Sequence, residues 1–493
     1  MSELDILDIL LDYRTTVPLQ ELDETIPLTP GPNRCRIHSF SLSGTLDSIL
    51  KFNDIIYSFT SLTSLMLNCW PYSLEVKTNE MEIDRILEAF PNLTYLMVRG
   101  CDYASLSPKS AILDQNGALY KLRSFHFDTE LLLMSESSLQ FFRRLGNLTS
   151  IGLHGWSHHS EFFLEKIQPQ VIGRILKGLD NKIESIKTGG VVPLYLYLLP
   201  QSVEASSLCR RGGTPSEQQL IEEQQLLQIG EAEEIFPQLT TFIASAPCIM
   251  SGEDLRCLGL RAQFLTHVDL SSSAVDADVP YTGFYGTDVY RDFHGQVENG
   301  AQKRHNITSL DLQLFLESCQ HLRHFCAERR TIHVKDMTPP DKRLSAMYYS
   351  PGPNGENPVI RAAKPWGCEA TLEKLEIGFR IISASPSDHR IVFGQLGRCK
   401  RLKSLKLTRS NVIPTLTHGV DLLEGLSDSL EEVLSWSSSW ACDDKETVMW
   451  MLTRLRKVRR MQTGIRNGSS IYERVNEWAS SVGRKHVLHF PEY

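Results

Sequence analysis

The stretch Leu402-Lys403-Ser404-Leu405-Lys406-Leu407 decides the fold, because its leucine spacing recurs along the chain. The pattern is L-x-x-L-x-L, which suits a short strand that is entered through a bend. Leu405 and Leu407 then alternate onto one face of the strand, and Leu402 lies just ahead of them. Leucine is a common residue, so one hexamer is weak evidence for a repeat fold. The number of copies along the chain decides whether the fold is a repeat.

Thirteen copies of this hexamer can be read along the chain, three of them imperfect. The first five begin at residues 37, 62, 93, 122 and 148, which are 25, 31, 29 and 26 residues apart. The others begin at residues 183, 239, 265, 322, 372, 402, 430 and 455. A period of this length is in the leucine-rich-repeat range.

The segments between copies predict helices that end just before the next strand. Residues 82–90 have apolar side chains at helical spacing and stop at Pro91. Similar patterns cover residues 47–59, 137–145, 254–260 and 310–319, a capping helix at 470–483 and a last edge strand at 486–490. The predicted fold class is therefore α/β: a leucine-rich-repeat solenoid, a curved horseshoe with parallel β-strands on the concave face and helices on the convex face.

The repeats also set the predicted domain organisation. Residues 1–34 form an N-terminal extension, expected to be largely disordered because it is rich in proline and threonine. Residues 35–490 form the solenoid. Three gaps exceed one period and are predicted to be surface insertions, at about 201–234, 271–305 and 329–365.

Composition narrows the class of protein. The chain has 493 residues, 41% of them hydrophobic and 22% charged, with a net charge of -8. This mild negative charge argues against a general nucleic-acid or membrane-surface binder. No apolar run approaches the roughly 20 residues of a membrane span, and the acidic start differs from a signal peptide. The 11 cysteines include no C-x-x-C pair and suit free thiols. We expect a cytoplasmic or nuclear protein that is not secreted.

The sequence lacks the common motifs of catalytic and nucleotide-binding sites. It contains no G-x-x-x-x-G-K-[ST], G-x-G-x-x-G, H-E-x-x-H or G-x-S-x-G. We therefore expect no enzyme, no catalytic residue and no cofactor. Three histidines, His154, His158 and His159, could ligate an ion, but a polar loop at the end of a strand is the favoured interpretation and no metal is expected.

Function in such a solenoid is expected on the concave face, where the residues between the leucines point. Aromatic, methionine and arginine side chains there suit a protein interface. The predicted partner-binding residues are Ser64, Met66, Tyr95, Met97, Arg99, His126, Asp128, His154, His267, Asp269, His324, Lys374, Glu376, Ser404, Lys406, Glu432 and Trp436.

The C-terminal third is locally basic around residues 398–409 and 454–460. Such a patch could hold an acidic partner or RNA. Glutamates at 373, 376, 431 and 432 are interleaved with the bases, and an ordinary solvated face is the favoured interpretation.

With the repeats laid out, the chain resembles intracellular leucine-rich-repeat proteins of the F-box/LRR type, particularly the divergent sets of filamentous fungi. The resemblance lies in the hexamers, in residues 312–325 and in Trp366-Gly367-Cys368 ahead of Leu372. It implies substrate recognition for a ubiquitin ligase. However, the leucine-proline-x-glutamate opening of an F-box is absent.

The predicted function is a protein–protein interaction module, a substrate-recognition protein lacking its F-box. The alternative is a ubiquitin-independent scaffold or regulator that binds one partner. The partner is expected to be another protein, with ubiquitin-ligase components as one class, and neither nucleic acid nor a membrane.

Overall fold

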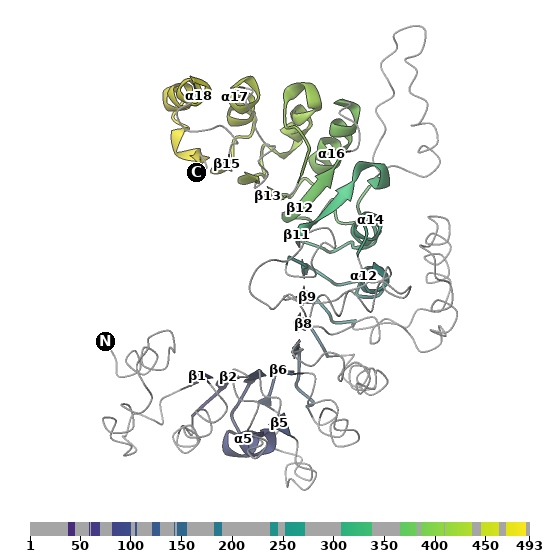
Figure 1. The fold of residues 1–493 in the computed structure, drawn as a ribbon, viewed down its shortest axis with the longest axis vertical. Helices are drawn as coiled ribbons and strands as arrows, with labels where there is room; N and C mark the ends of the chain where they lie inside the picture. The colour runs from purple at the N-terminus through teal and green to yellow at the C-terminus, as the bar shows by residue number, and fades with distance from the viewer. Residues whose placement is uncertain are drawn as a thin grey trace, which may run out of the picture. The chain divides into compact units, whose positions relative to one another are not determined.

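The computed structural model shows a repeated unit of strand, turn and helix (Figure 1). It describes residues 38–44, 59, 61–69, 81–99, 104–105, 121–128, 142, 145–154, 182–189, 237–244, 252–271, 307–337, 365–381, 386–408, 410–435, 445–462 and 470–489. The chain forms two compact units, Met1–Val192 and Pro193–Tyr493, and each is considered by itself. The predicted extension at 1–34 and the predicted insertion at 201–234 lie outside the described residues.

The first unit is a parallel sheet of single strands, each contributed by one hexamer copy. Its strands pair in chain order. Along the sequence, the helix α5 (Ile83–Ala89) and the two strands of a separate small sheet fall between them. The strands of the main sheet are β1 (Ser39–Gly44), β2 (Ser64–Cys69), β4 (Tyr95–Arg99), β6 (Ser124–Asp128), β7 (Ser150–His154) and β8 (Ser185–Gly189). The small sheet pairs β3 (Met81–Glu82) with β5 (Ala104–Ser105).

The second unit repeats the same arrangement with more of its helices described. Its strands are β9 (Thr241–Ala244), β10 (His267–Asp269), β11 (His324–His333), β12 (Lys374–Arg380), β13 (Ser404–Leu407), β14 (Glu432–Ser435), β15 (Arg460–Gln462) and β16 (Leu488–His489). Its helices are α12 (Gly252–Arg261), α14 (Ser309–Ser318), α16 (Pro386–Arg398), α17 (Lys445–Arg454) and α18 (Ser470–Ser481). Short 3-10 helices are η7 (Val334–Met337), η8 (Leu416–His418), η9 (Val420–Leu426) and η10 (Lys485–Val487).

The strand register places equivalent hexamer positions side by side. We number the six positions of L-x-x-L-x-L one to six and call each copy with its strand a rung. Leu375 of β12 is opposite Leu405 of β13, and Leu405 is opposite Val433 of β14. These parallel, in-register rungs with helices between them confirm the predicted α/β leucine-rich-repeat solenoid.

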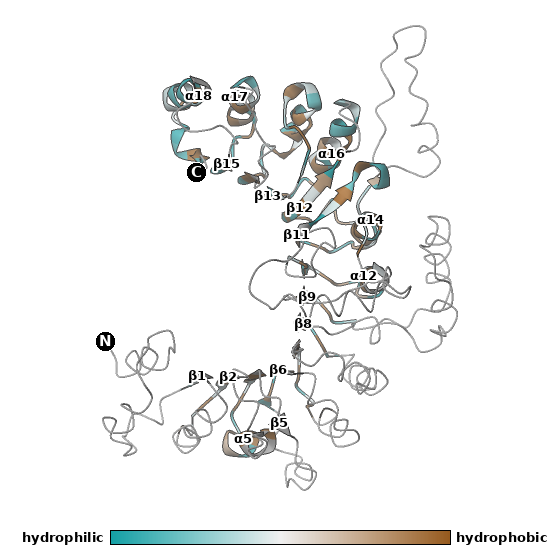
Figure 2. Cartoon of the chain, in the orientation of Figure 1, coloured by the Kyte–Doolittle hydropathy of each residue, from teal (hydrophilic) through white to brown (hydrophobic). Residues whose placement is uncertain are grey.

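The core lies between the sheet and the helices. Leu402, Leu405 and Leu407 are at most 1% exposed, as are their counterparts Leu65 and Leu96 at position four of the first unit's rungs. The helices that cover the sheet are amphipathic, and hydrophobic and hydrophilic residues alternate around α16 and α18 (Figure 2). Leucine at positions one, four and six thus builds the stack by burial.

A backbone ladder joins successive rungs. The carbonyl of position two accepts two N–H groups, from positions two and three of the next rung. Lys403 and Ser404 donate to the Glu373 carbonyl at 2.7 and 3.0 Å, and Glu431 and Glu432 donate to the Lys403 carbonyl at 2.7 and 2.9 Å. The same pair of bonds recurs along both units, so every rung is held in one register.

The thirteenth hexamer was placed three residues too early in the sequence analysis. The structure gives position one to Val458 and position four to Met461, because Arg459 and Arg460 make the ladder bonds to the Glu431 carbonyl. Leu455 instead closes the preceding helix, and its N–H donates to the Met451 carbonyl at 2.9 Å. An apolar pair three residues apart fits a helix end as well as a strand entry, which explains the error.

Several other predicted elements fall close to the observed ones, and the predicted helices at 47–59 and 137–145 lie almost entirely outside the described residues. Helices α5, α12 and α14 match the predicted segments, and α18 with β16 confirms the predicted capping helix and edge strand. Regular structure continues from β11 through η7, so residues 329–337 of the third predicted insertion belong to the repeat. The rest of that insertion, and nearly all of the one at 271–305, lies outside the described residues. In the part of the chain that is described, no helix has the length and apolar character needed to cross a bilayer.

Candidate functional site

The candidate site is the face of the sheet that the helices leave uncovered. Positions four and six point into the core, so positions three and five point the other way. We call this side the open face. In the second unit its position-three residues are Thr241, His267, His324, Lys374, Ser404, Glu432 and Arg460, and its position-five residues are Ile243, Asp269, Cys326, Glu376, Lys406, Leu434 and Gln462.

Eight of the predicted binding residues share this open face of the second unit. They come from five adjacent strands, β10 to β14, and the pairing of those strands aligns them in two columns. The eight are His267, Asp269, His324, Lys374, Glu376, Ser404, Lys406 and Glu432. The repeat therefore gathers side chains that are up to about 165 residues apart in the sequence, counting from 267 to 432.

An ion cluster occupies the centre of the open face. The Lys406 ammonium contacts the Glu376 carboxylate and lies 4.0 Å from Oε1 of Glu328. The side chains of Lys406 and Glu376 are only 18% and 7% exposed. The hexamer pattern predicts that Glu376 is exposed to a partner. The structure instead closes it off, because its neighbours on adjacent rungs pack over it.

Two histidines lie next to each other beside this cluster. The rings of His267 and His324 meet edge to face with centroids 4.0 Å apart. Burial lowers the pKa of both rings, with Arg323 lowering the pKa of His267 further and His267 doing so for His324. Both rings are therefore neutral near pH 7, and they present one aromatic, hydrogen-bonding surface.

The thiol on this face is not an activated nucleophile. Burial raises the pKa of Cys326, and the carboxylates of Glu376 and Asp269 raise it further. Asp269 itself accepts the backbone N–H of Ser271 at 2.9 Å. A thiol held in its protonated form is a poor nucleophile and a poor metal ligand.

Among the described position-three and position-five residues of the first unit's open face, Lys187 of β8 is the one charged side chain. Ser64, Met66, Tyr95 and Met97 are half-buried, and the Tyr95 hydroxyl lies 3.9 Å from the Met97 sulfur. His126 was expected on this surface. It is 2% exposed, because its ring packs against Tyr95 at a centroid distance of 5.3 Å.

Glycine at the next rung makes room for this buried histidine. A Cβ at Gly152 would come 2.2 Å from Nδ1 of His126, so only glycine fits there without a shift. This close approach ties His126 to its neighbouring rung. We therefore assign His126 to packing within the face.

Several predicted residues have side chains outside the described part of the structure, although Asp128 and His154 are register partners on β6 and β7. Arg99, Asp128 and His154 are the last residues of β4, β6 and β7, and their side chains lie outside the described residues. Trp436, His158 and His159 lie outside them as well. Within the ranges that are described, no group of three His, Cys, Asp or Glu side chains is arranged to hold a metal ion.

Position two carries a feature that the sequence analysis read only as a basic patch with interleaved glutamates. Charges alternate from rung to rung, and the residues are Arg323, Glu373, Lys403, Glu431 and Arg459. The Lys403 ammonium donates to Oε2 of Glu373 at 2.6 Å, and Arg323 Nη1 lies 3.9 Å from Oε1 of Glu373. The hydrogen bond from Lys403 lowers the pKa of Glu373. Aligning the second residue of each hexamer would have revealed this column.

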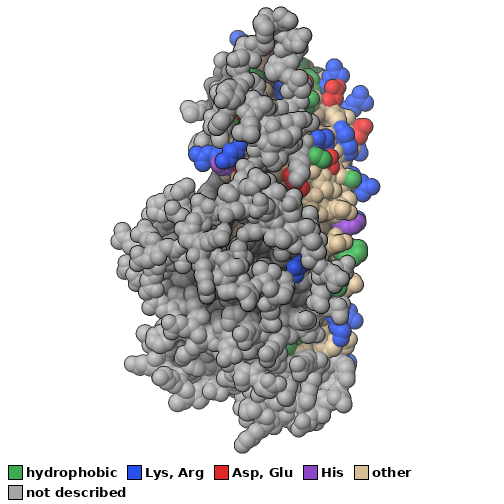
Figure 3. All heavy atoms as spheres, turned by 90° about the vertical axis from the view of Figure 1, so that its right-hand side faces the viewer, with side chains coloured by type: hydrophobic (Ala, Val, Ile, Leu, Met, Phe, Trp, Pro, Cys, Tyr) green, Lys and Arg blue, Asp and Glu red, His purple; other side chains and the backbone are tan. Residues whose placement is uncertain are grey.

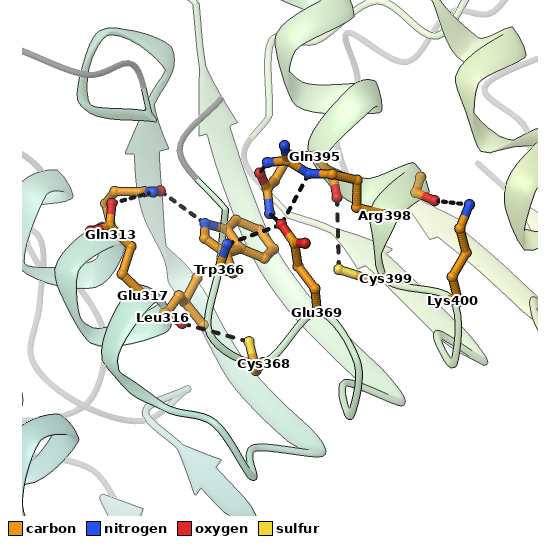
Figure 4. A network of polar contacts seen from close by, with 11 residues as sticks. Gln313, Leu316, Glu317, Trp366, Cys368, Glu369, Gln395, Arg398, Cys399 and Lys400 are labelled. Carbon is orange, nitrogen blue, oxygen red and sulfur yellow. Dashed lines mark hydrogen bonds and ion pairs between the residues drawn. The ribbon is translucent and has the colours of Figure 1, made fainter. Parts of the chain in front are cut away.

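A polar network ties the helices together on the other side of the sheet (Figure 4). Trp366 donates its indole N–H to Gln313 of α14 at 3.0 Å, and its backbone N–H donates to Glu369 at 3.1 Å. Glu369 also meets Gln395 and Arg398 of α16, at 2.9 and 3.0 Å. This network joins neighbouring repeats, so Trp366 serves the fold.

Glycine is required beside that tryptophan. A Cβ at Gly367 would lie 2.5 Å from the carbonyl oxygen of Glu317, and the Gly367 N–H donates to the Leu316 carbonyl at 3.0 Å. Close packing against α14 thus explains the Trp366-Gly367-Cys368 motif.

Comparisons with known proteins find the same type of repeat at low similarity. No family model and no curated protein matches the chain. A leucine-rich-repeat protein of Leptospira interrogans aligns with 12% identity and a TM-score of 0.29, covering 86% of this chain and 89% of its own. A leucine-rich-repeat-containing protein from Legionella pneumophila aligns with 11% identity and the same TM-score, 0.29, covering 78% and 96%. The fold assignment rests on the rung register and the ladder described above.

Proposed function

We propose that this chain is a non-catalytic protein-interaction module that binds a protein partner on the open face of its second unit. The observation that carries the proposal is the convergence of eight side chains from five adjacent strands on one rigid surface. Neutral imidazoles, a primary ammonium and carboxylates side by side suit the polar part of a protein interface. The protonated Cys326 thiol and the ion-paired Glu376 favour binding over catalysis.

The test is capture of a partner from the native host by proximity labelling or pull-down. The double variant His267→Ala/His324→Ala removes the histidine pair from the middle of the face. Glu424→Ala is the control, because Glu424 is exposed on η9 and its ion pair with Arg454 is exposed on both sides. We expect the double variant to lose most of the captured partner and the control to retain it. Equal capture by both variants would overturn the proposal.

We further propose that the module recognises a substrate in the manner of F-box/LRR proteins. The support is the resemblance of its hexamers to that family. Residues 1–37, ahead of the first described rung, lie outside the described structure. Affinity purification from overexpressing cells should then recover a cullin-RING adaptor together with the partner. Recovery of the partner without any adaptor would favour the ubiquitin-independent scaffold or regulator instead.

A further inference from the structure

Charged residues gather along one edge of the second unit, where the chain enters strands β11 to β15. We call this edge the entry rim and define it by the charged residues at position two, at position three and just before position one. They are Arg323, Glu373, Lys374, Arg401, Lys403, Glu431, Glu432, Lys457, Arg459 and Arg460. Lys and Arg number seven and Glu three, in a chain whose net charge is -8. In Figure 3, Lys and Arg side chains gather along the upper right edge of the molecule, with acidic groups between them.

Cations and carboxylates of the rim differ in exposure. All seven Lys and Arg residues are exposed, whereas all three glutamates are half-buried. Two of the three glutamates have local partners: Glu373 pairs with Lys403 and Arg323, and Glu432 accepts a hydrogen bond from the Ser404 hydroxyl at 3.0 Å. In the described part of the chain, no ion pair engages Lys374, Arg401, Arg459 or Arg460. The surface that a partner meets is therefore positive.

The spacing of the position-two cations is set by the sheet. Arg323, Lys403 and Arg459 immediately precede β11, β13 and β15, and the rungs of Glu373 and Glu431 lie between theirs. Neighbouring parallel strands are about 4.8 Å apart, so cations on alternate rungs repeat at about 10 Å. A polyproline II segment rises about 3.1 Å per residue with three residues per turn, so its every third side chain recurs on one face at about 9 Å.

We propose that the entry rim binds an acidic extended segment of a protein partner, with a carboxylate at every third residue. Each carboxylate would sit beside one cationic rung and avoid the glutamate rung next to it. This inference rests on the proposed function and adds the chemical class of the partner.

The interleaved glutamates favour a peptide over a nucleic acid. A phosphate backbone carries charge along its whole length, with one negative charge per roughly 1.7 Å of duplex axis, and would meet the carboxylates of Glu373 and Glu431 as well. Phe264, 53% exposed, is stacked on His321 at a centroid distance of 5.8 Å and is one aromatic group beside the rim. Single-stranded binding would need several stacking platforms along the strand.

The experiment measures peptide binding to the full chain by fluorescence anisotropy. The probe is a labelled peptide of six Glu-Pro-Pro repeats. The matched probe has the same composition with its glutamates in one block, and a third probe is a single-stranded oligonucleotide. The rim variant is Arg323→Gln/Lys403→Gln. The control variant, Lys121→Gln/Lys182→Gln, makes the same charge change at exposed lysines of the first unit.

We expect the repeat peptide to bind more tightly than the block peptide, and the rim variant to weaken it about tenfold, with weaker binding at high salt. The control variant should bind like the unmodified chain. Equal binding of both peptides, tighter binding of the oligonucleotide or an unaffected rim variant would each overturn the inference. The two proposals can fail separately. If His267→Ala/His324→Ala loses the captured partner but the unmodified chain binds neither peptide, the proposed function stands and only this inference is overturned.

Discussion

The two units share one backbone ladder, and position two differs most between the threonine rungs of the first unit and the charged rungs that begin at β11 in the second. In the first unit threonines at this position donate their hydroxyls to the rung before: Thr63 Oγ1 to the His38 carbonyl at 2.9 Å and Thr94 Oγ1 to the Thr63 carbonyl at 3.0 Å. From β11 onward in the second unit the same position carries alternating charges, and Lys403 pairs with Glu373 across the rungs. A threonine hydroxyl adds a hydrogen bond to the carbonyl of the preceding rung. In the described rungs from β11 onward, a long charged side chain extends into solvent and makes no such bond.

The open faces of the two units also differ in charge. The first unit presents the uncharged residues Met66, Tyr95 and Met97, of which Tyr95 and Met97 are in contact. The second presents Lys406 held between two carboxylates, beside a histidine pair. The same repeat therefore carries mostly uncharged side chains on the open face of the first unit and a charged cluster on that of the second, and we place recognition at the charged cluster.

Core leucines should show no difference between the units. Leu96→Ala and Leu405→Ala each remove a side chain that is at most 1% exposed, so each should cost about 2–5 kcal/mol of unfolding free energy. Denaturant unfolding measures both. Lys374→Ala is the exposed control and should change stability by less than about 0.5 kcal/mol. A small cost at either leucine would show that its rung is not packed as described.

Acid should destabilise the second unit through His389 of α16. Its Nδ1 accepts the Ile413 N–H at 3.0 Å, and burial, with a smaller effect of His418, lowers the pKa of the ring to about 4. The unfolded chain takes up this proton below about pH 6.5, so the stabilisation is present above that pH and is lost as the pH falls toward 4. The loss amounts to at most about 3 kcal/mol.

The measurement is the free energy of unfolding between pH 7 and pH 4, followed by denaturant titration. His389→Gln should flatten the pH dependence, since an amide does not titrate in this range. If the unfolding free energy of His389→Gln falls with pH as steeply as that of the unmodified protein, groups other than His389 cause the acid sensitivity.

Lys406→Ala should be costlier than an ordinary surface substitution. It leaves the nearly buried carboxylate of Glu376 without its cation, at a cost of about 1–3 kcal/mol. The double variant Lys406→Met/Glu376→Leu removes both charges and should recover most of this loss. Additive costs of the two single changes in a double-mutant cycle would contradict a coupled pair.

Position two should show the smallest effects and a contrast between the units. Thr94→Val removes the hydroxyl bond to the Thr63 carbonyl and should cost about 1 kcal/mol, independent of salt. Lys403→Met removes a pair in which the lysine is 55% exposed, so it should cost less, and its cost should vanish in high salt. Unfolding at low and high ionic strength separates the two. The reverse order would mean that the charges, and not the hydroxyls, hold the rungs together.

The strands could be predicted from the sequence because the leucine spacing within one hexamer shows which residues face the core and which face the other side. Leu402, Leu405 and Leu407 are buried by a rule local to six residues. The burial of Glu376 and His126 could not be read in the same way, because it depends on side chains from rungs 25 or more residues away. The shift at Leu455 has another cause: an apolar residue three before Val458 serves a helix end and a strand entry equally well.

The doubly accepting carbonyl at position two has a consequence for how the chain can change over time. The two N–H bonds to this carbonyl use only main-chain atoms, so they form whichever of the observed side chains stands at position two. Such a position tolerates substitution by residues as different as threonine, glutamate and arginine. The charge pattern at position two can therefore change one rung at a time while the main-chain bonds between rungs are kept.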